Sequence, residues 1–417
     1  MWLVNPYGPL PDEGWRDTRY TMMARALEAR GHRVIWWTAG FSHFSKRVRS
    51  RVWQRRIYEE GFEALLVPVP SYERHVGLGR IAFELAFASR FFRRASGENP
   101  PDVMVTVNPP QTTSFAAAKL ARRMGVPLVV DVMDLWPEAF ASIFPAWARP
   151  LARKALMPLR QLRRYSLRSA AEAIAVCPSY AQLVMREAPA LASGGCTTVY
   201  FGVDVGRVRS AARGQASEPG ISRSKESGET WIVYAGTLGE RYDIATVLEV
   251  ARLLAGTTPP IRFLVAGEGP LKRAVLAAAA SGSPVEYLGV LGPEALWTLY
   301  GSCDIALCPY SEGSTVGIPA KAFDYLAAGL PVIHSLRDDW ADLVEQHDVG
   351  VPYSAGDAAS LREAVVRLAR DDGTRRRQRD NALQLAESFD ERLQYGRFAD
   401  VVERAASGRE RRVVGAA

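Results

Sequence analysis

Long hydrophobic runs are missing from this chain of 417 residues. No stretch of uncharged apolar residues reaches the length of about 18 that crosses a bilayer as a helix, so we expect no membrane-spanning segment. The opening Met1–Asn5 run meets Pro6 without a basic lead or a long apolar core, and therefore does not resemble a secretory signal. These absences favour a cytoplasmic protein.

Cysteine and histidine are scarce, with four and five copies. Cys303 and Cys308 are separated by four residues, and no second pair of Cys or His stands near them, as a zinc site requires. The histidines show no ligand spacing, and no Ser-His-Asp order is apparent. We therefore expect no metal site, and cysteines that act as small buried apolar residues.

Acidic residues are absent from two strongly basic stretches. Residues 41–56 carry six Lys or Arg and residues 139–171 carry seven, and both stretches interleave them with large apolar side chains. This composition suits an anionic membrane surface, to which each basic residue near it contributes about 1 kcal/mol. An ordinary solvated helix face is an alternative interpretation. Nucleic acid is another, but no recognisable nucleic-acid motif accompanies the charge, and we expect no such partner.

Short apolar runs alternate with helical stretches, which is the pattern of parallel α/β sheets. In the first half, Gly31 ends a helix predicted over 18–30, in the position that favours a left-handed backbone. A second helix is predicted over 113–124. The predicted strands span residues 2–5, 32–38, 64–67, 103–107, 127–132, 173–176 and 197–201.

The alternation begins again at Thr230, after a polar segment with almost no large apolar residues. Predicted strands span 231–235, 262–266, 285–288, 305–308 and 332–334. Predicted helices span 244–254, 294–301, 321–328, 339–346, 358–370, 373–388 and 391–406, and another begins near Leu271.

We therefore predict an α/β fold with two Rossmann-like, doubly wound parallel-sheet domains that face each other across a cleft. The N-terminal domain covers 1–204, and residues 205–229 form a linker or mobile loop. The C-terminal domain covers 230–388. A C-terminal helix and tail cover 389–417, and the helix near 389–406 is expected to pack back on the N-terminal domain.

The densest local signal is residues 304–333, in which a buried strand leads to Pro309, a loop of small and polar residues and then a helix. A helix start offers unpaired N–H groups and a partial positive charge to a phosphate. Lys321 adds a full charge in the first turn. Asp324 lies one turn further on, where a carboxylate can reach a ribose or sugar hydroxyl. A plain strand–loop–helix crossover is the alternative.

This segment resembles the donor-site signature of the retaining glycosyltransferases of family 4, which have the GT-B fold. It is most similar to the bacterial branch that builds capsule, O-antigen and exopolysaccharide repeats. Other motifs of that family follow in order, and nearly the whole chain keeps the family's spacing. These motifs are residues 131–137 (DVMDLWP), 202–204 (GVD), 234–239 (YAGTLG), 266–270 (AGEGP) and 287–289 (YLG).

The resemblance implies site residues. The predicted catalytic residues are Asp134, Asp324, Lys321 and Arg241. The predicted nucleotide-sugar contacts are Gly236, Thr237, Leu238, Gly239, Arg241, Gly267, Glu268, Gly289, Ser314, Thr315, Gly317, Pro319, Lys321 and Asp324. Two alternatives stay open, namely that Asp134 only caps the next helix and that Arg241 is a solvated loop residue.

The sequence departs from the broader family at one acidic position. That family has two Glu residues separated by seven others; here Asp324 fills the second position and Val316 the first, with Glu312 nearby. The family's usual Arg and Lys beside the diphosphate are not plainly matched. Arg241 and Lys321 are the nearest basic candidates, and Lys272 is a weaker one.

The loop after the first strand also lies at the edge where ligands bind in such sheets. Its charged residues are candidates for contact with acceptor or donor, and none stands out; they are Asp12, Glu13, Arg16 and Asp17.

We predict transfer of a sugar from a nucleotide diphosphate sugar, with a UDP-sugar favoured, to a lipid-linked polyprenyl diphosphate glycan at the inner face of the plasma membrane. The departing diphosphate needs positive charge and oriented N–H donors. The resemblance implies retention of configuration, no required metal or other cofactor, and a departing phosphate that takes the acceptor's proton.

Two other functions are weighed against this prediction. One is a non-catalytic, membrane-associated scaffold or partner subunit with a decayed donor site, which Val316 favours. The other is an NAD-linked oxidoreductase, but residues 267–270 lack the third glycine of the dinucleotide fingerprint.

Overall fold

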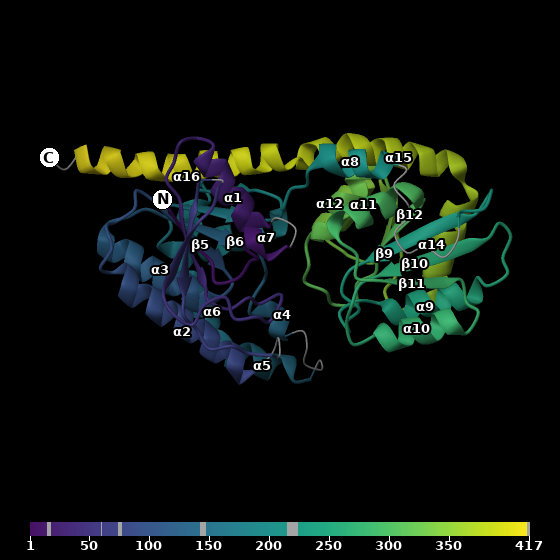
Figure 1. Cartoon of the computed structure of the whole chain (residues 1–417), viewed down its shortest axis with the longest axis horizontal. Coiled ribbons are helices and arrows are strands. Elements are labelled where there is room, and N and C mark those ends of the chain that lie inside the picture. The colour runs from purple at the N-terminus through teal and green to yellow at the C-terminus, as the bar shows by residue number, and fades with distance from the viewer. Residues whose placement is uncertain (15–17, 60, 74–76, 142–146, 215–223, 415–417) are drawn as a thin grey trace. The chain divides into compact units, whose positions relative to one another are not determined.

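The computed structural model describes residues 1–14, 18–59, 61–73, 77–141, 147–214 and 224–414. The chain divides into two compact units, an N-terminal unit of residues 1–201 and 392–417 and a C-terminal unit of residues 202–391. Each unit is a largely parallel sheet between helices (Figure 1). This confirms the predicted fold class of two α/β parallel-sheet domains. Arg16, Asp17 and His75 lie outside the described residues.

The N-terminal unit holds an eight-stranded sheet in the order β3-β4-β2-β1-β5-β6-β7-β8. Only β3 runs antiparallel to its neighbour. The central strands are buried on both faces, so their sequences are almost entirely apolar. The strands are β1 (Trp2–Val4), β2 (Ile35–Ala39), β3 (Gln54–Ile57), β4 (Glu63–Val67), β5 (Met104–Asn108), β6 (Leu128–Val132), β7 (Glu172–Ala175) and β8 (Cys196–Thr198).

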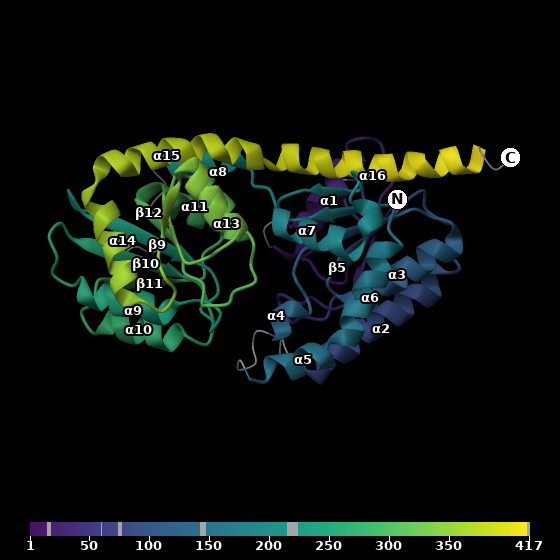
Figure 2. The ribbon, with the colours of Figure 1, turned by 180° about the vertical axis from the view of Figure 1, so that it is seen from behind.

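Helices cover both faces of this sheet. Helices α2 (Leu78–Ala95), α3 (Gln111–Met124) and α6 (Met157–Arg168) lie on one face, while α1 (Arg19–Glu28) and α16 (Glu391–Val414) lie on the other (Figures 1 and 2). The remaining helices of the unit are α4 (Glu138–Ala141), α5 (Arg149–Ala155) and α7 (Pro178–Glu187), with short 3-10 turns at Pro11–Glu13 and Pro189–Leu191.

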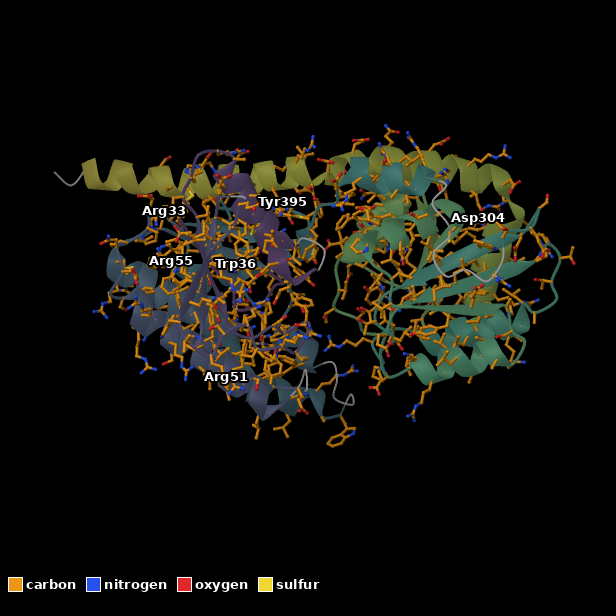
Figure 3. All side chains as sticks on the ribbon, in the orientation of Figure 1. Arg33, Trp36, Arg51, Arg55, Asp304 and Tyr395 are labelled. Carbon is orange, nitrogen blue, oxygen red and sulfur yellow. The ribbon has the colours of Figure 1, made fainter. Side chains whose placement is uncertain are left out.

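The last helix completes the hydrophobic core of the N-terminal unit. Phe398 and Val402 of α16 are fully buried in one cluster with Trp36 of β2 and Leu27 of α1. Figure 3 shows Trp36 and Tyr395 within this unit, and the Tyr395 hydroxyl donates to the Phe201 carbonyl at 2.5 Å. The C-terminal helix is therefore an integral part of the N-terminal fold.

A buried ion pair joins the start of α1 to the end of β6. Arg19 donates from Nη2 to Asp131 Oδ1 at 2.8 Å and from Nε to Oδ2 at 3.0 Å. It also donates from Nη1 to the Tyr200 carbonyl at 2.9 Å. Arg19 is 4% exposed and Asp131 is completely buried. Each charge therefore depends on the other to offset the cost of leaving water.

The C-terminal unit holds a six-stranded parallel sheet in the order β11-β10-β9-β12-β13-β14. The first strand of the unit, β9, lies between β10 and β12, so the direction of winding reverses between β9 and β12. Ligands of such sheets bind outside the carboxyl ends of the strands at this reversal. The strands are β9 (Thr230–Ala235), β10 (Ile261–Ala266), β11 (Val285–Gly289), β12 (Ile305–Cys308), β13 (Val332–His334) and β14 (Gly350–Pro352).

Helices again cover the sheet on both sides. Helices α9 (Ile244–Leu253) and α10 (Lys272–Ala280) lie on one face, and α8 (Val205–Arg213), α11 (Pro293–Ser302) and α12 (Ala320–Ala327) lie on the other (Figures 1 and 2). The unit also contains α13 (Asp339–His347), α14 (Ala358–Arg370), which packs on α9, and α15 (Asp372–Ala386), followed by a 3-10 turn at Glu387–Phe389.

The prediction of a linker over 205–229 is wrong for its first part, because residues 205–213 form α8. Val205 and Val208 give the helix a narrow buried stripe, and Asp204 caps it by accepting the Arg207 N–H at 2.8 Å. Residues 215–223 lie outside the described part of the chain. Beyond them, Lys225 pairs with Asp304, which Figure 3 marks, at 2.6 Å.

We predict that Asp131→Ala lowers the free energy of unfolding by about 3–5 kcal/mol, because it leaves the Arg19 guanidinium buried without its carboxylate. Urea unfolding followed by tryptophan fluorescence measures the loss. The control is Asp400→Ala, which removes a carboxylate that pairs with Arg30 at the surface and costs about 1 kcal/mol or less. Equal losses in the two variants would contradict the prediction.

Candidate functional site

Two glycine-containing loops lie side by side at the carboxyl ends of β9 and β10. The N–H of Leu238 donates to the Glu268 carbonyl, and the N–H of Leu271 donates back to the Leu238 carbonyl, each at 2.9 Å. The Gly236 N–H donates to the Ala266 carbonyl, also at 2.9 Å. These bonds bring the predicted contacts Gly236, Thr237, Leu238, Gly239, Gly267 and Glu268 into one backbone assembly.

This close approach requires glycine. Gly267 has φ +141° and Gly269 has φ +153°, a region that other residues rarely adopt. A Cβ on Gly267 would collide with the Gly236 carbonyl oxygen, and a Cβ on Gly269 would collide with the Leu238 carbonyl oxygen. The glycine spacing in residues 266–270 therefore follows from the contact between the two loops.

The loop that follows β12 is tied to the turn that follows β9. The Ser311 N–H donates to the Arg241 carbonyl at 3.0 Å, and the Ser311 hydroxyl donates to the Glu240 carbonyl at 2.9 Å. The Asp243 N–H donates to the Pro309 carbonyl at 3.0 Å. These bonds place Arg241 beside the 309–319 loop, and its side chain is exposed. Phosphate contact and a solvated loop residue therefore both stay open as interpretations of Arg241.

The same loop leads into α12. The Ser314 N–H donates to the Ser311 carbonyl at 3.2 Å, and the Ser314 hydroxyl accepts the Val316 N–H at 3.3 Å. Thr315 and Gly317 complete the loop, and Pro319 stands at the cap position of α12 without a side-chain capping bond. The first N–H groups of the helix therefore point toward the end of the sheet where a ligand is expected.

Lys321 projects from the first turn of α12 into an aromatic enclosure. Its Nζ lies 4.3 Å from the ring centroid of Tyr234, 4.6 Å from that of Tyr242 and 5.8 Å from that of Tyr310. The Nζ atom is buried and makes no hydrogen bond within the described structure. Because burial disfavours the charged amine, the pKa of Lys321 falls to about 8.

Asp324 lies one turn beyond Lys321 on α12 and is 6% exposed. The next residue, Tyr325, accepts the Ala235 N–H on its hydroxyl at 3.0 Å and so joins α12 to the end of β9. Asp324 therefore belongs to the same strand end as Lys321.

The rest of the predicted nucleotide contacts lie at the β10 and β11 ends. The carbonyl of Gly289 accepts the Gly267 N–H at 2.7 Å, so Gly289 also joins the loop assembly. Glu268 pairs with Lys272 at 2.9 Å, and the hydrogen bond from Lys272 lowers the Glu268 pKa. The charge of Lys272, the weaker basic candidate, is thus directed at a neighbouring carboxylate.

Val316 stands at the position where the broader family has its first acidic residue. Val316 is half-buried in the 309–319 loop, while Glu312 stands exposed at a turn of the same loop. His334 ends β13 nearby; burial lowers its pKa to about 4, so the imidazole is neutral near pH 7. Its Nδ1 lies 3.2 Å from the Leu336 carbonyl, which fits a packing role.

In the N-terminal unit, Asp134 organises the turn after β6. Its Oδ1 accepts the Leu135 N–H at 2.8 Å and its Oδ2 accepts the Trp136 indole N–H at 3.0 Å. Helix α4 begins only at Glu138, so the alternative interpretation of Asp134 as the cap of the next helix is wrong. Asp134 is half-buried, and its catalytic role stays a prediction.

The acidic candidates of the first loop are engaged by the basic stretch 41–56. Glu13 accepts from Arg49 at 2.6 Å, and Asp12 accepts from Arg56 at 2.8 Å. These ion pairs hold the two loops together. The sequence did not indicate them, because the partners are far apart along the chain.

The grouping of three tyrosines around Lys321 was also missed in the sequence. Tyr234, Tyr242 and Tyr310 each follow or end an ordinary apolar strand, where tyrosine is common, and nothing in their spacing marks them as one group. Among the described residues, no group of three or more His, Cys, Asp or Glu is arranged to hold a metal ion. The part of the chain that the structure describes also has no helix both long and apolar enough to cross a bilayer.

Comparisons with known proteins cover most of the chain. The model of the "Glycosyl transferase 4-like domain" family matches residues 17–193, and that of "Glycosyl transferases group 1" matches residues 229–371.

Two curated relatives are similar over part of their length. The amylovoran biosynthesis glycosyltransferase AmsK of Erwinia amylovora is 25% identical over 182 residues, which are 42% of this chain and 45% of that protein. The phosphatidyl-myo-inositol mannosyltransferase of Mycobacterium leprae is 25% identical over 163 residues, 39% of this chain and 43% of that protein. The aligned segments thus span less than half of either relative.

A solved structure extends the likeness in fold to nearly the whole chain. Anabaena Alr3699/HepE in complex with UDP has a TM-score of 0.65 at 14% identity, covering 96% of this chain and 98% of that one.

We predict that Gly267→Ala destabilises the protein by about 2–4 kcal/mol, because it combines an unfavourable φ with a Cβ inside the neighbouring loop. Thermal and urea unfolding measure the change. Gly292→Ala is the matched control, because a Cβ there meets nothing within 4 Å. If Gly267→Ala unfolded at the wild-type denaturant concentration, the close approach of the loops would be refuted.

Proposed function

This chain belongs to the family 4 glycosyltransferases, which have the GT-B fold, and we propose on that premise that it transfers a sugar from a nucleotide diphosphate sugar to an acceptor. The C-terminal unit binds the donor at the carboxyl ends of β9 and β12 under this proposal. The transfer proceeds with retention of the sugar's anomeric configuration, as the family resemblance implies.

The observation that carries the proposal is the buried amine of Lys321. Its Nζ has no hydrogen-bond acceptor among the described residues. An ammonium group that is removed from water without an acceptor is unfavourable by several kcal/mol. A phosphate oxygen placed against this amine would supply the missing acceptor and the opposite charge.

The surrounding backbone supports a phosphate at this position. Helix α12 begins beside Lys321 without a side-chain cap, and a helix start favours an anion through its N–H groups and its dipole. The Gly236–Gly239 loop adjoins the same amine, because a Cβ on Gly236 would lie 2.5 Å from Lys321 Nζ.

In the proposed reaction, the bond between the anomeric carbon and the diphosphate oxygen breaks while the acceptor oxygen forms its bond to the same carbon. Lys321 and the α12 N–H groups stabilise the negative charge that develops on the departing diphosphate. The acceptor's proton passes to the departing phosphate, as the family resemblance suggests, so no separate base is needed. Arg241 and Asp324 contact the phosphate and the ribose or sugar, respectively.

We propose a UDP-sugar as the donor. The support is the fold-level likeness to Alr3699/HepE, which is described as a complex with UDP. The name of AmsK refers to amylovoran biosynthesis, which fits a role for the present chain in surface polysaccharide synthesis.

We propose a lipid-linked acceptor and a membrane surface for the N-terminal unit. Trp147, just before α5, is 84% exposed, and Leu151, within α5, is 71% exposed. The basic residues Arg153 and Lys154 follow on the same helix. Exposed apolar side chains interleaved with cations suit the boundary of an anionic bilayer. The name of the mannosyltransferase relative, which specifies a lipid, agrees with such an acceptor.

Part of the basic stretch 139–171 serves the fold instead. Arg163 is fully buried and pairs with Glu138 and Glu187 at 2.7 Å each. Arg160 pairs with Glu138 as well, and Arg168 donates to the Glu187 carbonyl. The proposed membrane surface is therefore limited to the α5 end of this stretch.

A second candidate function is a non-catalytic scaffold with the same fold. The observation that favours it is Val316, because a valine cannot hydrogen-bond a sugar hydroxyl in the position of the first acidic residue. Donor turnover separates the two candidates.

We predict that Lys321→Met reduces release of nucleoside diphosphate by about 100-fold, because one preorganised positive donor is lost. Mass spectrometry of nucleotides released from a panel of donor sugars, with and without membrane lipid extract, measures it. In the wild type, the rate should fall as the pH rises through about 8, where the Lys321 ammonium loses its proton. The rate of Lys321→Met should not show this fall near pH 8.

Lys119→Met is the control for that experiment, since Lys119 is exposed on α3 in the other unit. If Lys321→Met and Asp324→Ala both released nucleotide at the wild-type rate, the site assignment would be wrong. If the wild type released none from any donor in the panel, the scaffold function would be favoured.

We predict that the double variant Trp147→Ser and Leu151→Ser binds anionic vesicles about 100-fold more weakly, because two apolar side chains that together contribute about 3 kcal/mol are lost. Co-sedimentation with phosphatidylglycerol vesicles measures binding, which should also weaken as salt rises. Leu253→Ser removes an exposed apolar side chain of the C-terminal unit and should change nothing. Equal binding by all three proteins would refute the proposed surface.

A further inference from the structure

The enclosure of Lys321 is built from three separate chain segments. Tyr234 is the last residue but one of β9, Tyr242 lies between β9 and α9, and Tyr310 is the second residue after β12. The rings of Tyr242 and Tyr310 are 4.9 Å apart between centroids, and those of Tyr234 and Tyr242 are 6.0 Å apart. Three rings thus surround one amine.

Hydrogen bonds of the surrounding chain position the segments that carry the rings. The Tyr234 hydroxyl donates to the Thr237 carbonyl at 2.6 Å. Tyr242 and Tyr310 are joined by an antiparallel backbone bridge, and the Tyr310 N–H donates to the Ser335 hydroxyl at 2.7 Å. None of these bonds involves Lys321, so the backbone that carries the rings is held independently of the amine.

The three tyrosines and the thiol that lie near the amine are uncharged at neutral pH. Burial raises the pKa of all three tyrosines well above the neutral range, and it raises the pKa of the Cys308 thiol on β12 to about 12. No salt bridge to Lys321 occurs within the described part of the chain. The neighbourhood of Lys321 thus offers polarisable rings and a thiol in place of a counter-ion.

The other two lysines of the same unit show the contrast. Lys225 pairs with Asp304 at 2.6 Å, and Lys272 pairs with Glu268 at 2.9 Å. A carboxylate beside Lys321 would neutralise the amine and repel an incoming phosphate. Aromatic faces attract a cation through their quadrupole without adding negative charge, and this attraction is strongest where water is excluded.

Because Gly236 has no side chain, the Lys321 amine can lie directly against the Gly236–Gly239 loop. A Cβ at this position would lie 2.5 Å from Lys321 Nζ and 3.4 Å from the Tyr234 hydroxyl. The amine thus occupies the space beside Gly236 that a side chain would take. An oxyanion bound at that loop would lie next to the ammonium group.

We propose that Tyr234, Tyr242 and Tyr310 are positioning residues that hold the Lys321 ammonium at the donor diphosphate and stabilise its charge in place of a carboxylate. The inference rests on the proposed function for the identity of the oxyanion. It goes further by assigning a task to three residues and by excluding a permanent counter-ion for this lysine.

The first test reads the amine directly, without a ligand. The sequence contains only six lysines, so NMR of protein labelled at lysine Cε resolves them, and Lys321→Met assigns the signal. Tyr242→Leu and Tyr310→Leu should each lower the titration midpoint by about one pH unit, because the charged amine loses a ring. Tyr242→Phe and Tyr310→Phe keep the ring and should titrate near the wild type.

If the Lys321 titration midpoints were the same in the Leu, Phe and wild-type proteins, the proposal that the three tyrosines stabilise the ammonium charge would be refuted, whatever the ligand proves to be. Thermal unfolding of each variant accompanies the titration. If Tyr242→Leu or Tyr310→Leu fails to fold, Met replaces Leu at the same position, because Met also fills the space without an aromatic face.

The second test is calorimetric titration of UDP, with uridine as the comparison. At pH 8 the Leu variants should bind UDP about tenfold more weakly than the Phe variants, while uridine binding stays equal. A wild type that binds no UDP would refute the proposed UDP-sugar donor but not the role of the three tyrosines, which the lysine titration decides. UDP affinity that is equal in the Leu and Phe variants would refute the positioning role.

Discussion

A positive charge buried without a carboxylate is the constraint around which the end of the C-terminal sheet is arranged. The Lys321 amine needs a cavity with aromatic walls, and those walls come from the ends of β9 and β12. It also needs a neighbour without a side chain, which Gly236 provides. The crossing of the two glycine loops and the bond from Ala235 to Tyr325 fix the strand ends at the required spacing. Charge, aromatic rings and glycines thus form one unit that is complementary to an anion.

Local patterns in the sequence predicted most of the fold. Helix α14 was predicted with its observed bounds, since its apolar residues recur at helical spacing and Asp357 caps it. The central strands of both sheets were found because they are short apolar runs. The misses are helices α2, α5, α6, α7 and α8 and the edge strands β3 and β14, and two of them have a clear physical cause. Strand β3 reads Gln-Arg-Arg-Ile because it is an exposed edge that charge protects, and α8 has too narrow an apolar stripe to stand out.

The candidate site was only partly predictable. The glycines and Lys321 lie within short contiguous motifs, so their place at the strand ends followed from local order. The partners of those residues did not, because they are distant in sequence: Tyr310 lies 68 residues after Tyr242, yet the two rings are in contact. Likewise, the basic stretches of the sequence did not indicate which arginines are buried in ion pairs. Arg163 is as basic as Arg153, but only the fold reveals that Arg163 is buried between two carboxylates.

The placement of α16 has a consequence for the biogenesis of the protein. Its apolar residues, Phe398 and Val402 among them, belong to the core of a unit whose sheet is made from the first half of the chain. A ribosome synthesises the entire second unit before these residues emerge. The second unit can therefore fold while translation continues, whereas the first must wait with part of its core exposed to water, to be sealed only when the final helix arrives.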